Sequence, residues 1–71
     1  MTIATRIIEI AKSERCHIHP DGTILFPDAL GRTALAIALE DEFGIPDLPE
    51  DEVERCCSVS DWVALVGKVS R

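Results

Sequence analysis

The sequence predicts an all-α domain in which three main helices and one short third helix form a four-helix bundle, with a long loop between the first two helices. Apolar residues recur with the helical period of about 3.6 in three separate segments. Hydrophobic residues make up 46% of the chain, which is enough for a compact core. Proline and glycine clusters fall between the segments and end the helices. Because the chain has 71 residues and no linker or internal repeat, residues 1–71 are expected to form a single domain.

The first helix is predicted over residues 2–15, with Thr2 as its N-cap. Its apolar face comprises Ile3, Ala4, Ile7, Ile8, Ile10 and Ala11. The turn-forming run "HPDG" ends this helix. The segment "TILF" at 23–26 has the composition of a short strand, but no neighbouring segment offers a pairing partner, so we expect a loop that places Ile24, Leu25 and Phe26 against the core.

The second helix is predicted over residues 28–43, with Asp28 as its N-cap and Gly44 just beyond its end. Apolar residues occupy two nearly opposite sides of it. One side comprises Leu30, Thr33, Ala34 and Ile37, and the other comprises Leu35, Leu39 and Phe43. A helix that is apolar on two sides is usually surrounded by others, so we expect this helix at the centre of the bundle.

Two further helices complete the prediction. Pro46 and Pro49 prevent a long helix across 44–49, and Pro49 suits the start of a short third helix anchored by Val53. The last helix begins with Ser58 and Asp61 at the spacing of a capping box. Its predicted buried face comprises Val59, Trp62, Val63, Val66 and Val69.

Charge and cysteine content exclude several classes of protein. With 13 acidic and 7 basic residues, the net charge of −6 disfavours nucleic acid as a partner, because phosphate binding needs a basic face. No segment approaches the roughly 20 apolar residues of a membrane span, and the first residues lack the pattern of a signal peptide. We therefore expect a cytoplasmic monomer. The three cysteines, Cys16, Cys56 and Cys57, are expected to be reduced, with Cys56 in the core.

The second half of the chain resembles the acyl carrier protein family. That family has a helix, a long loop, an Asp-Ser-Leu motif that opens a second helix with an acidic end, a short helix and a capped last helix. Here "ALEDEFGIPDLPEDEVERC" and "CSVSDWVALV" carry the resemblance, which is strong from about residue 23 onward. In the same register Asp28, Ala29 and Leu30 stand at the family's Asp-Ser-Leu.

The resemblance implies a non-enzymatic carrier that presents acyl or related thioesters to the enzymes of fatty acid or polyketide biosynthesis. The family's serine is esterified to 4′-phosphopantetheine by a phosphopantetheinyl transferase. Ala29 has no hydroxyl, so this attachment cannot form here. Either the chain carries an engineered serine-to-alanine replacement, which the otherwise well-kept pattern favours, or the natural protein lacks the attachment residue. In the second case the chain would be a structural or regulatory interaction module on the carrier fold.

The resemblance also implies that acids along the second and third helices bind basic patches on partner enzymes. The matching residues are Glu40, Asp41, Glu42, Glu50, Asp51, Glu52 and Glu54. Gly31, Arg32 and Ala34 depart from the pattern, because many relatives carry acidic or hydroxyl residues there. A cationic Arg32 should disfavour partners built for an acidic helix start, which indicates a specialised carrier. The alternative is that the acids only form a solvated surface.

Other candidate sites have weaker support. "CHIH" at 16–19 together with Cys56 and Cys57 matches no standard zinc spacing, so no metal site is predicted. A Cys57–histidine pair lacks a third catalytic group, and no catalytic residue is predicted. The hydroxyls of Thr33, Ser58 and Ser60 are expected to be structural, with Thr33 facing the core.

Overall fold

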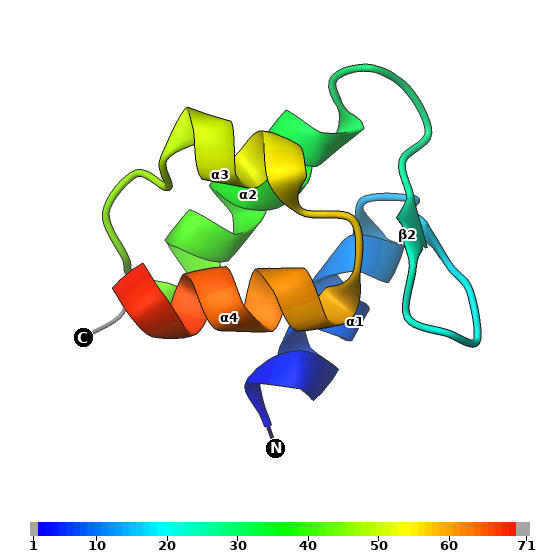
Figure 1. Ribbon diagram of the computed structural model, residues 1–71, viewed down its shortest axis with the longest axis horizontal. Coiled ribbons are helices and arrows are strands. Elements are labelled where there is room, and N and C mark those ends of the chain that lie inside the picture. Colours follow the sequence, from blue (N-terminus) through cyan, green and yellow to red (C-terminus); the bar gives the residue numbers. More distant parts are fainter. Residues whose placement is uncertain (1, 70–71) are drawn as a thin grey trace.

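The computed structural model describes residues 2–69, and within that range it contains four helices and one two-stranded sheet (Figure 1). Helix α1 packs against α2 and α4, and the short α3 contacts both α2 and α4. The prediction of a small, mostly helical bundle with one short helix is confirmed, while the sheet was not predicted. The elements are α1 (Ile3–Ser13), β1 (His17–Ile18), β2 (Ile24–Leu25), α2 (Gly31–Phe43), α3 (Glu50–Arg55) and α4 (Val59–Val69).

Helix α1 begins as predicted and ends two residues early. Thr2 is the N-cap, and its hydroxyl accepts the amide N–H of Thr5 at 3.2 Å. At the other end Arg15 adopts a left-handed backbone conformation with φ of 66°, and the amide of Cys16 donates to the carbonyl of Ala11 at 2.9 Å. This is the usual geometry of a helix terminus, so the predicted end at residue 15 was wrong by one half turn.

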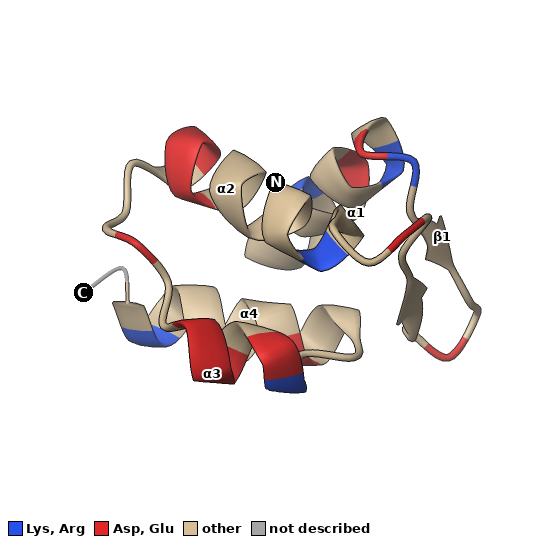
Figure 2. Ribbon diagram, turned by 90° about the horizontal axis from the view of Figure 1, so that it is seen from above, with Lys and Arg blue, Asp and Glu red and all other residues tan. Residues whose placement is uncertain are grey.

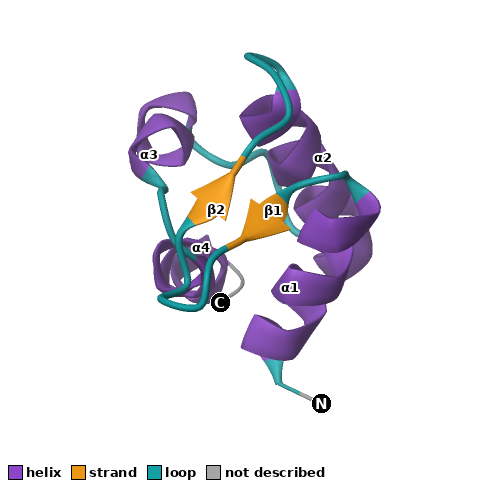
Figure 3. Cartoon of the chain, turned by 90° about the vertical axis from the view of Figure 1, so that its right-hand side faces the viewer, coloured by secondary structure: helices purple, strands orange, loops and turns teal. Residues whose placement is uncertain are grey.

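The segment 23–26 is not an unpaired loop, and that prediction was wrong. Strands β1 and β2 pair antiparallel, with Ile18 opposite Ile24 (Figure 3). The chain reverses at 20–22, where Asp21 Oδ1 accepts the amide of Thr23 at 2.9 Å, and so it supplies its own pairing partner. Strand β2 also bonds onward, because the amide of Ile24 donates to the carbonyl of Cys57 at 2.9 Å. The loop is therefore tied directly to the start of α4.

Helix α2 starts at Gly31, three residues later than predicted, and Asp28 is not its N-cap. Asp28 instead closes the preceding turn, where its Oδ1 accepts the amide of Leu30 at 2.9 Å and its carbonyl accepts that of Gly31 at 3.1 Å. The chain before the helix lies close to it. A Cβ on Gly31 would approach both Phe26 Cβ and Pro27 Cδ to 2.9 Å. The helix end matches the prediction, since Gly44 has φ of 61°.

Only one side of α2 faces the core, so the prediction of a central helix buried on two sides was wrong. Leu35 and Leu39 are completely buried. On the opposite side Leu30 is 73% exposed and Ile37 is 59% exposed, and Thr33 is exposed rather than core-facing. The remaining helices cover a single face of α2, which leaves an apolar surface in contact with solvent.

The second half of the chain folds largely as its pattern predicts. Val53 is the buried residue of α3, and Pro49 precedes the first turn of that helix. The capping box at α4 is present, because Ser58 Oγ accepts the amide of Asp61 at 3.3 Å and Asp61 Oδ2 accepts that of Ser58 at 3.1 Å. The same carboxylate oxygen also accepts the amide of Cys57 at 2.9 Å. Asp61 therefore holds the turn between α3 and α4.

The core is formed by aliphatic side chains around one tryptophan. Trp62 is completely buried, and its indole Nε1 has no hydrogen-bond partner among residues 2–69. Cys56 is 4% exposed, which confirms the prediction that it lies in the core. The other completely buried large side chains are Ile7, Leu35, Leu39 and Val66, so three of the four helices contribute to the centre.

Replacing Gly31 by alanine should destabilise the fold, because the added Cβ must displace Phe26 and Pro27. We expect a loss of about 1–3 kcal/mol in the free energy of unfolding, measured by urea denaturation. Gly67→Ala is the matched control. That glycine lies within α4 with open space around its Cβ position, so the change should stabilise by about 0.5–1 kcal/mol. Equal and favourable effects at both positions would contradict the close packing at Gly31.

Replacing Asp61 by asparagine should lower stability in a pH-dependent way. The amides of Cys57 and Ser58 hold the pKa of the Asp61 carboxyl below its ordinary value of about 3.9. A carboxyl whose pKa is lower in the folded chain stabilises it above the unfolded value, and loses that effect as the pH falls through the folded value. The parent chain should therefore have a higher Tm than Asp61→Asn at pH 7, and this difference should decrease as the pH falls through the lowered pKa of Asp61. Exposed Glu54→Gln serves as the control, and a Tm difference independent of pH would refute the role of the charge.

Candidate functional site

The residues at the predicted attachment motif form an exposed turn directly before α2. Asp28, Ala29 and Leu30 are all exposed, and the two hydrogen bonds to Asp28 fix the backbone of the turn. Since the side chain of residue 29 is not covered, a group attached there would extend into solvent. The turn therefore places this position at the surface, at the beginning of the longest helix of the described chain.

Several features at the start of α2 favour a nearby anion. The amides of Leu30 and Gly31 are bound to Asp28, whereas those of Arg32 and Thr33 have no partner outside the helix within residues 2–69. Free amides at a helix start and the helix dipole both favour a nearby anion. No acidic residue lies in the first turn of α2, and Arg32 adds a full positive charge. The nearest like charge to a phosphodiester on residue 29 would be the Asp28 carboxylate, which accepts the amide of Leu30.

The side chain at position 29 does not fit a covalent phosphopantetheine, because alanine offers no oxygen for the ester. Other hydroxyls nearby do not replace it. Ser58 Oγ accepts the amide of Asp61 at the start of α4, as predicted, and Ser60 lies in the first turn of the same helix. Thr33 is exposed one turn beyond position 29, contrary to the prediction that it faces the core. No chemical step through the prosthetic group can be derived for this chain as it stands.

The predicted partner-binding acids divide into two groups. Three of them have intramolecular partners: Glu40 Oε2 accepts the amide of Leu48 at 2.7 Å, Glu42 pairs with Arg6 at 2.6 Å, and Glu52 pairs with Lys68 at 2.7 Å. Glu42 and Glu52 thus join helices, and Glu40 holds the loop after α2. The remaining acids are exposed and form no ion pair with any residue from 2 to 69, and they are Asp41, Glu50, Asp51 and Glu54. Figure 2 shows acidic segments at the end of α2 and along α3.

Arg32 has an unusual environment for an arginine on an acidic protein. Its Cζ lies 4.9 Å from the centroid of the Phe26 ring, a distance at which a cation is attracted to the aromatic face. Its Nε is buried and has no hydrogen-bond partner in the described part of the chain. Within that part it forms no salt bridge, whereas Arg6 and Lys68 do. Arg32 therefore remains available to an external anion.

A groove runs between α2 and α3, and sequence reasoning did not identify it. It has a volume of about 370 Å³. Its apolar lining is formed by Ala36, Ile37, Leu48 and Val53, and polar contributions come from Thr33, Glu40, Asp47 and Glu50. The signal in the sequence was the second apolar side of α2, which was interpreted as buried. Exposed Leu30 and Ile37 extend this apolar surface toward the turn at position 29.

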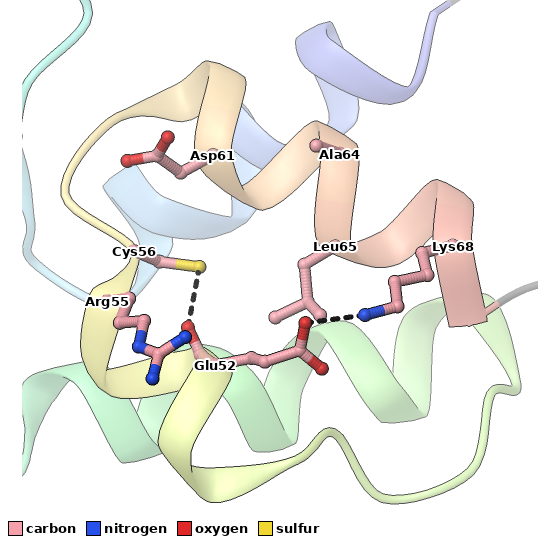
Figure 4. A pocket seen from close by; sticks show the side chains of 7 residues that line it. All are labelled: Glu52, Arg55, Cys56, Asp61, Ala64, Leu65 and Lys68. Carbon is pink, nitrogen blue, oxygen red and sulfur yellow. Dashed lines mark hydrogen bonds and ion pairs between the residues drawn. The ribbon is translucent and has the colours of Figure 1, made fainter.

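A second hollow of about 230 Å³ lies between α3 and α4. Figure 4 shows Cys56 and Lys68 both directed toward Glu52 across it. The Cys56 thiol donates to the carbonyl of Glu52 at 3.3 Å, and burial raises the pKa of this thiol to about 11. Thiolates are the nucleophilic form of cysteine, so the raised pKa disfavours reaction of Cys56 at neutral pH.

The structure brings the histidines together without a metal-binding cluster. The rings of His17 and His19 are 5.1 Å apart and nearly perpendicular. Among residues 2–69 no group of three or more histidine, cysteine or acidic side chains is arranged to hold a metal ion. No helix in this range is both long enough and apolar enough to cross a membrane.

Comparison of the chain with protein-family models, with curated proteins and with solved structures found no match.

The three thiols should differ sharply in reactivity. Cys57 is exposed, whereas Cys16 and Cys56 are buried and burial raises the pKa of both thiols. Brief treatment of the folded chain with iodoacetamide at pH 8 should modify Cys57, with the other two modified only after unfolding. Peptide mass spectrometry identifies the sites, and Cys57→Ser is the control that should abolish the rapid reaction. Rapid modification of Cys56 would show that the interface between α3 and α4 is open.

Proposed function

We propose that this chain is a non-enzymatic carrier protein of the acyl-carrier type, in a form that lacks the attachment serine. The observation that carries the proposal is the exposed turn Asp28–Ala29–Leu30 directly before α2. This turn stands in the register of the family's Asp-Ser-Leu, and the acidic end of α2 and the capped α4 follow at the matching distances. With serine at position 29, the protein would present thioester-bound acyl or related intermediates to partner enzymes.

The physical properties of the turn suit such a role. An attached phosphodiester anion would lie at the positive end of a 13-residue helix. When bound, 4′-phosphopantetheine supplies a thiol on a long flexible arm, and a chain with serine at position 29 would hold it through the oxygen of that side chain. Asp28 fixes the backbone at that residue. The turn would thus hold the attachment point in place while the phosphopantetheine arm moves.

The surface beside this turn supports docking to other proteins. Leu30 and Ile37 are exposed apolar residues on α2, and Asp41, Glu50, Asp51 and Glu54 leave unpaired negative charge near its end and on α3. Apolar contact area surrounded by charge is typical of protein interfaces. Partners would include a phosphopantetheinyl transferase and acyl-processing enzymes with basic patches. The acids Glu40, Glu42 and Glu52 would contribute less, because they already have internal partners.

A second function is favoured by a specific observation at the same place. Ala29 lacks the attachment oxygen, and Gly31, at a position where many members of the family carry an acidic or hydroxyl residue, packs so closely against Phe26 and Pro27 that an added Cβ would have to displace them. The start of α2 therefore departs from the family pattern in residue type, and the close packing at Gly31 disfavours the side chains of that pattern. These departures suit a structural or regulatory interaction module that uses the bundle and its exposed surface without any cargo.

Ala29→Ser should convert the chain into a substrate for modification. When this variant is incubated with coenzyme A and a broad-specificity phosphopantetheinyl transferase, it should gain the mass of one phosphopantetheine. The reason is that the new hydroxyl is exposed and lies beside free helix amides that favour the phosphodiester. Intact-protein mass spectrometry gives the result directly.

The parent chain is the matched control, because it contains Thr33, Ser58 and Ser60 but no hydroxyl at position 29. It should gain no mass under the same conditions. Circular dichroism should first show that Ala29→Ser is folded. If the folded variant stays unmodified at saturating transferase, the carrier function is refuted and the interaction module remains.

A further inference from the structure

The groove between α2 and α3 is negatively charged at the end formed by the last residues of α2 and the first residue of α3. Its apolar floor is formed by Ala36, Ile37, Leu48 and Val53, and Glu40, Asp47 and Glu50 line it near the end of α2 and the start of α3. Glu40 is held in place by its hydrogen bond to the amide of Leu48. This end of the groove is negative and positionally fixed.

Arg32 lies in the first turn of α2, next in sequence to Thr33, which lines the groove, although Arg32 itself is not part of the lining. The guanidinium is held against the Phe26 ring, which limits its motion without using its N–H donors. Within residues 2–69 no acid pairs with it. The far end of the groove is therefore negative, while near position 29 the charges are Arg32, which is unpaired within residues 2–69, and the Asp28 carboxylate, which accepts the amide of Leu30.

This charge arrangement is not explained by the stability of α2. A helix dipole favours acids in the first turn and bases in the last turn. Helix α2 has the reverse, with no acid in its first turn, no base in its last turn, Arg32 near its start and Glu40, Asp41 and Glu42 at its end. Glu40 and Glu42 have internal partners that account for their positions, whereas Arg32 forms no salt bridge within residues 2–69, so Arg32 is the charge that a binding partner would explain.

We propose that Arg32 selects a partner protein that places a carboxylate opposite it. The partner segment would insert an apolar side chain over Ile37, direct lysine or arginine toward Glu40, Asp47 and Glu50, and direct aspartate or glutamate toward Arg32. That the partner carries basic residues rests on the proposed function. That it also carries a carboxylate opposite Arg32 is the new inference. A partner with lysine or arginine along its whole contact surface would place one of these positive charges next to Arg32. The repulsion between the two positive charges would reduce affinity.

Selection of small helical binders tests this inference without knowledge of the natural partner. A displayed library of helical miniproteins, randomised over one face with acidic, basic and apolar residues, is selected against the 71-residue chain with Ala29. Counter-selection against Ile37→Glu retains only binders of the groove, and this substitution is tolerated by the fold because Ile37 is 59% exposed. The selected miniproteins are then titrated against Arg32→Glu and against Arg55→Glu, an equal charge change at an exposed residue of α3 outside the groove.

We expect the selected miniproteins to carry an aspartate or glutamate that is required for binding. Arg32→Glu should weaken them about tenfold, Arg55→Glu should change affinity by less than about twofold, and exchange of the required acid for arginine should restore binding to Arg32→Glu. Thermal unfolding of each variant checks that the fold is retained. Groove binders without a required acid, binders indifferent to Arg32→Glu, or failure to obtain any groove binder would each overturn the inference. Modification of Ala29→Ser is measured separately, so the carrier function and the selectivity of Arg32 can fail independently.

Discussion

The constraint on which the rest of the structure depends is the closure of one small core around Trp62. The sequence has 71 residues and the described range holds no disulfide, so this core must hold the chain by packing alone. Trp62 of α4 is completely buried, as are Ile7 of α1 and Leu35 of α2. Burial is so complete that the indole N–H has no partner among residues 2–69, which costs stability and is offset by the packing area of the ring. Because α1, α3 and α4 meet on one side of α2, the opposite side of that helix stays in solvent.

The exposed surface of α2 follows from this arrangement, and the proposed docking of partner proteins depends on this surface. The turn at 28–30 precedes the helix and is held away from the core by Asp28 and by the close contact of Gly31 with Phe26 and Pro27. On the same helix Ile37 borders the groove to α3, with acids at its far end and Arg32 near its start. A rigid core thus displays a turn, an apolar strip and separated charges on a single helix. These are the properties expected of a protein that is recognised by partners.

Much of the fold could be predicted from local signals. The Ser58–Asp61 capping box, Gly44, Thr2 and Val53 act through contacts within a few residues, and each was identified correctly.

The errors concern contacts between distant segments. The strand at Ile24 depends on His17 and Ile18 and on the carbonyl of Cys57, which no local pattern reveals. The apolar pattern of α2 indicated two buried sides, but a chain with so few helices can cover only one. At the candidate site the motif singled out position 29. The exposure of that position, the pairing of Glu42 with Arg6 and the pairing of Glu52 with Lys68 depend on how the segments meet and were not predicted.

The central claim is that residue 29 is the functional centre of a carrier. Everything around it suits that role except the missing oxygen, since the turn is exposed, the helix start is positive and the neighbouring surface is open to partners. Sequencing the codon for residue 29 in the source gene tests the claim most directly. The account predicts a serine codon, which would make Ala29 an introduced change at an attachment residue. An alanine codon would contradict the carrier function and would leave a docking module in which Arg32 and the groove do the recognising.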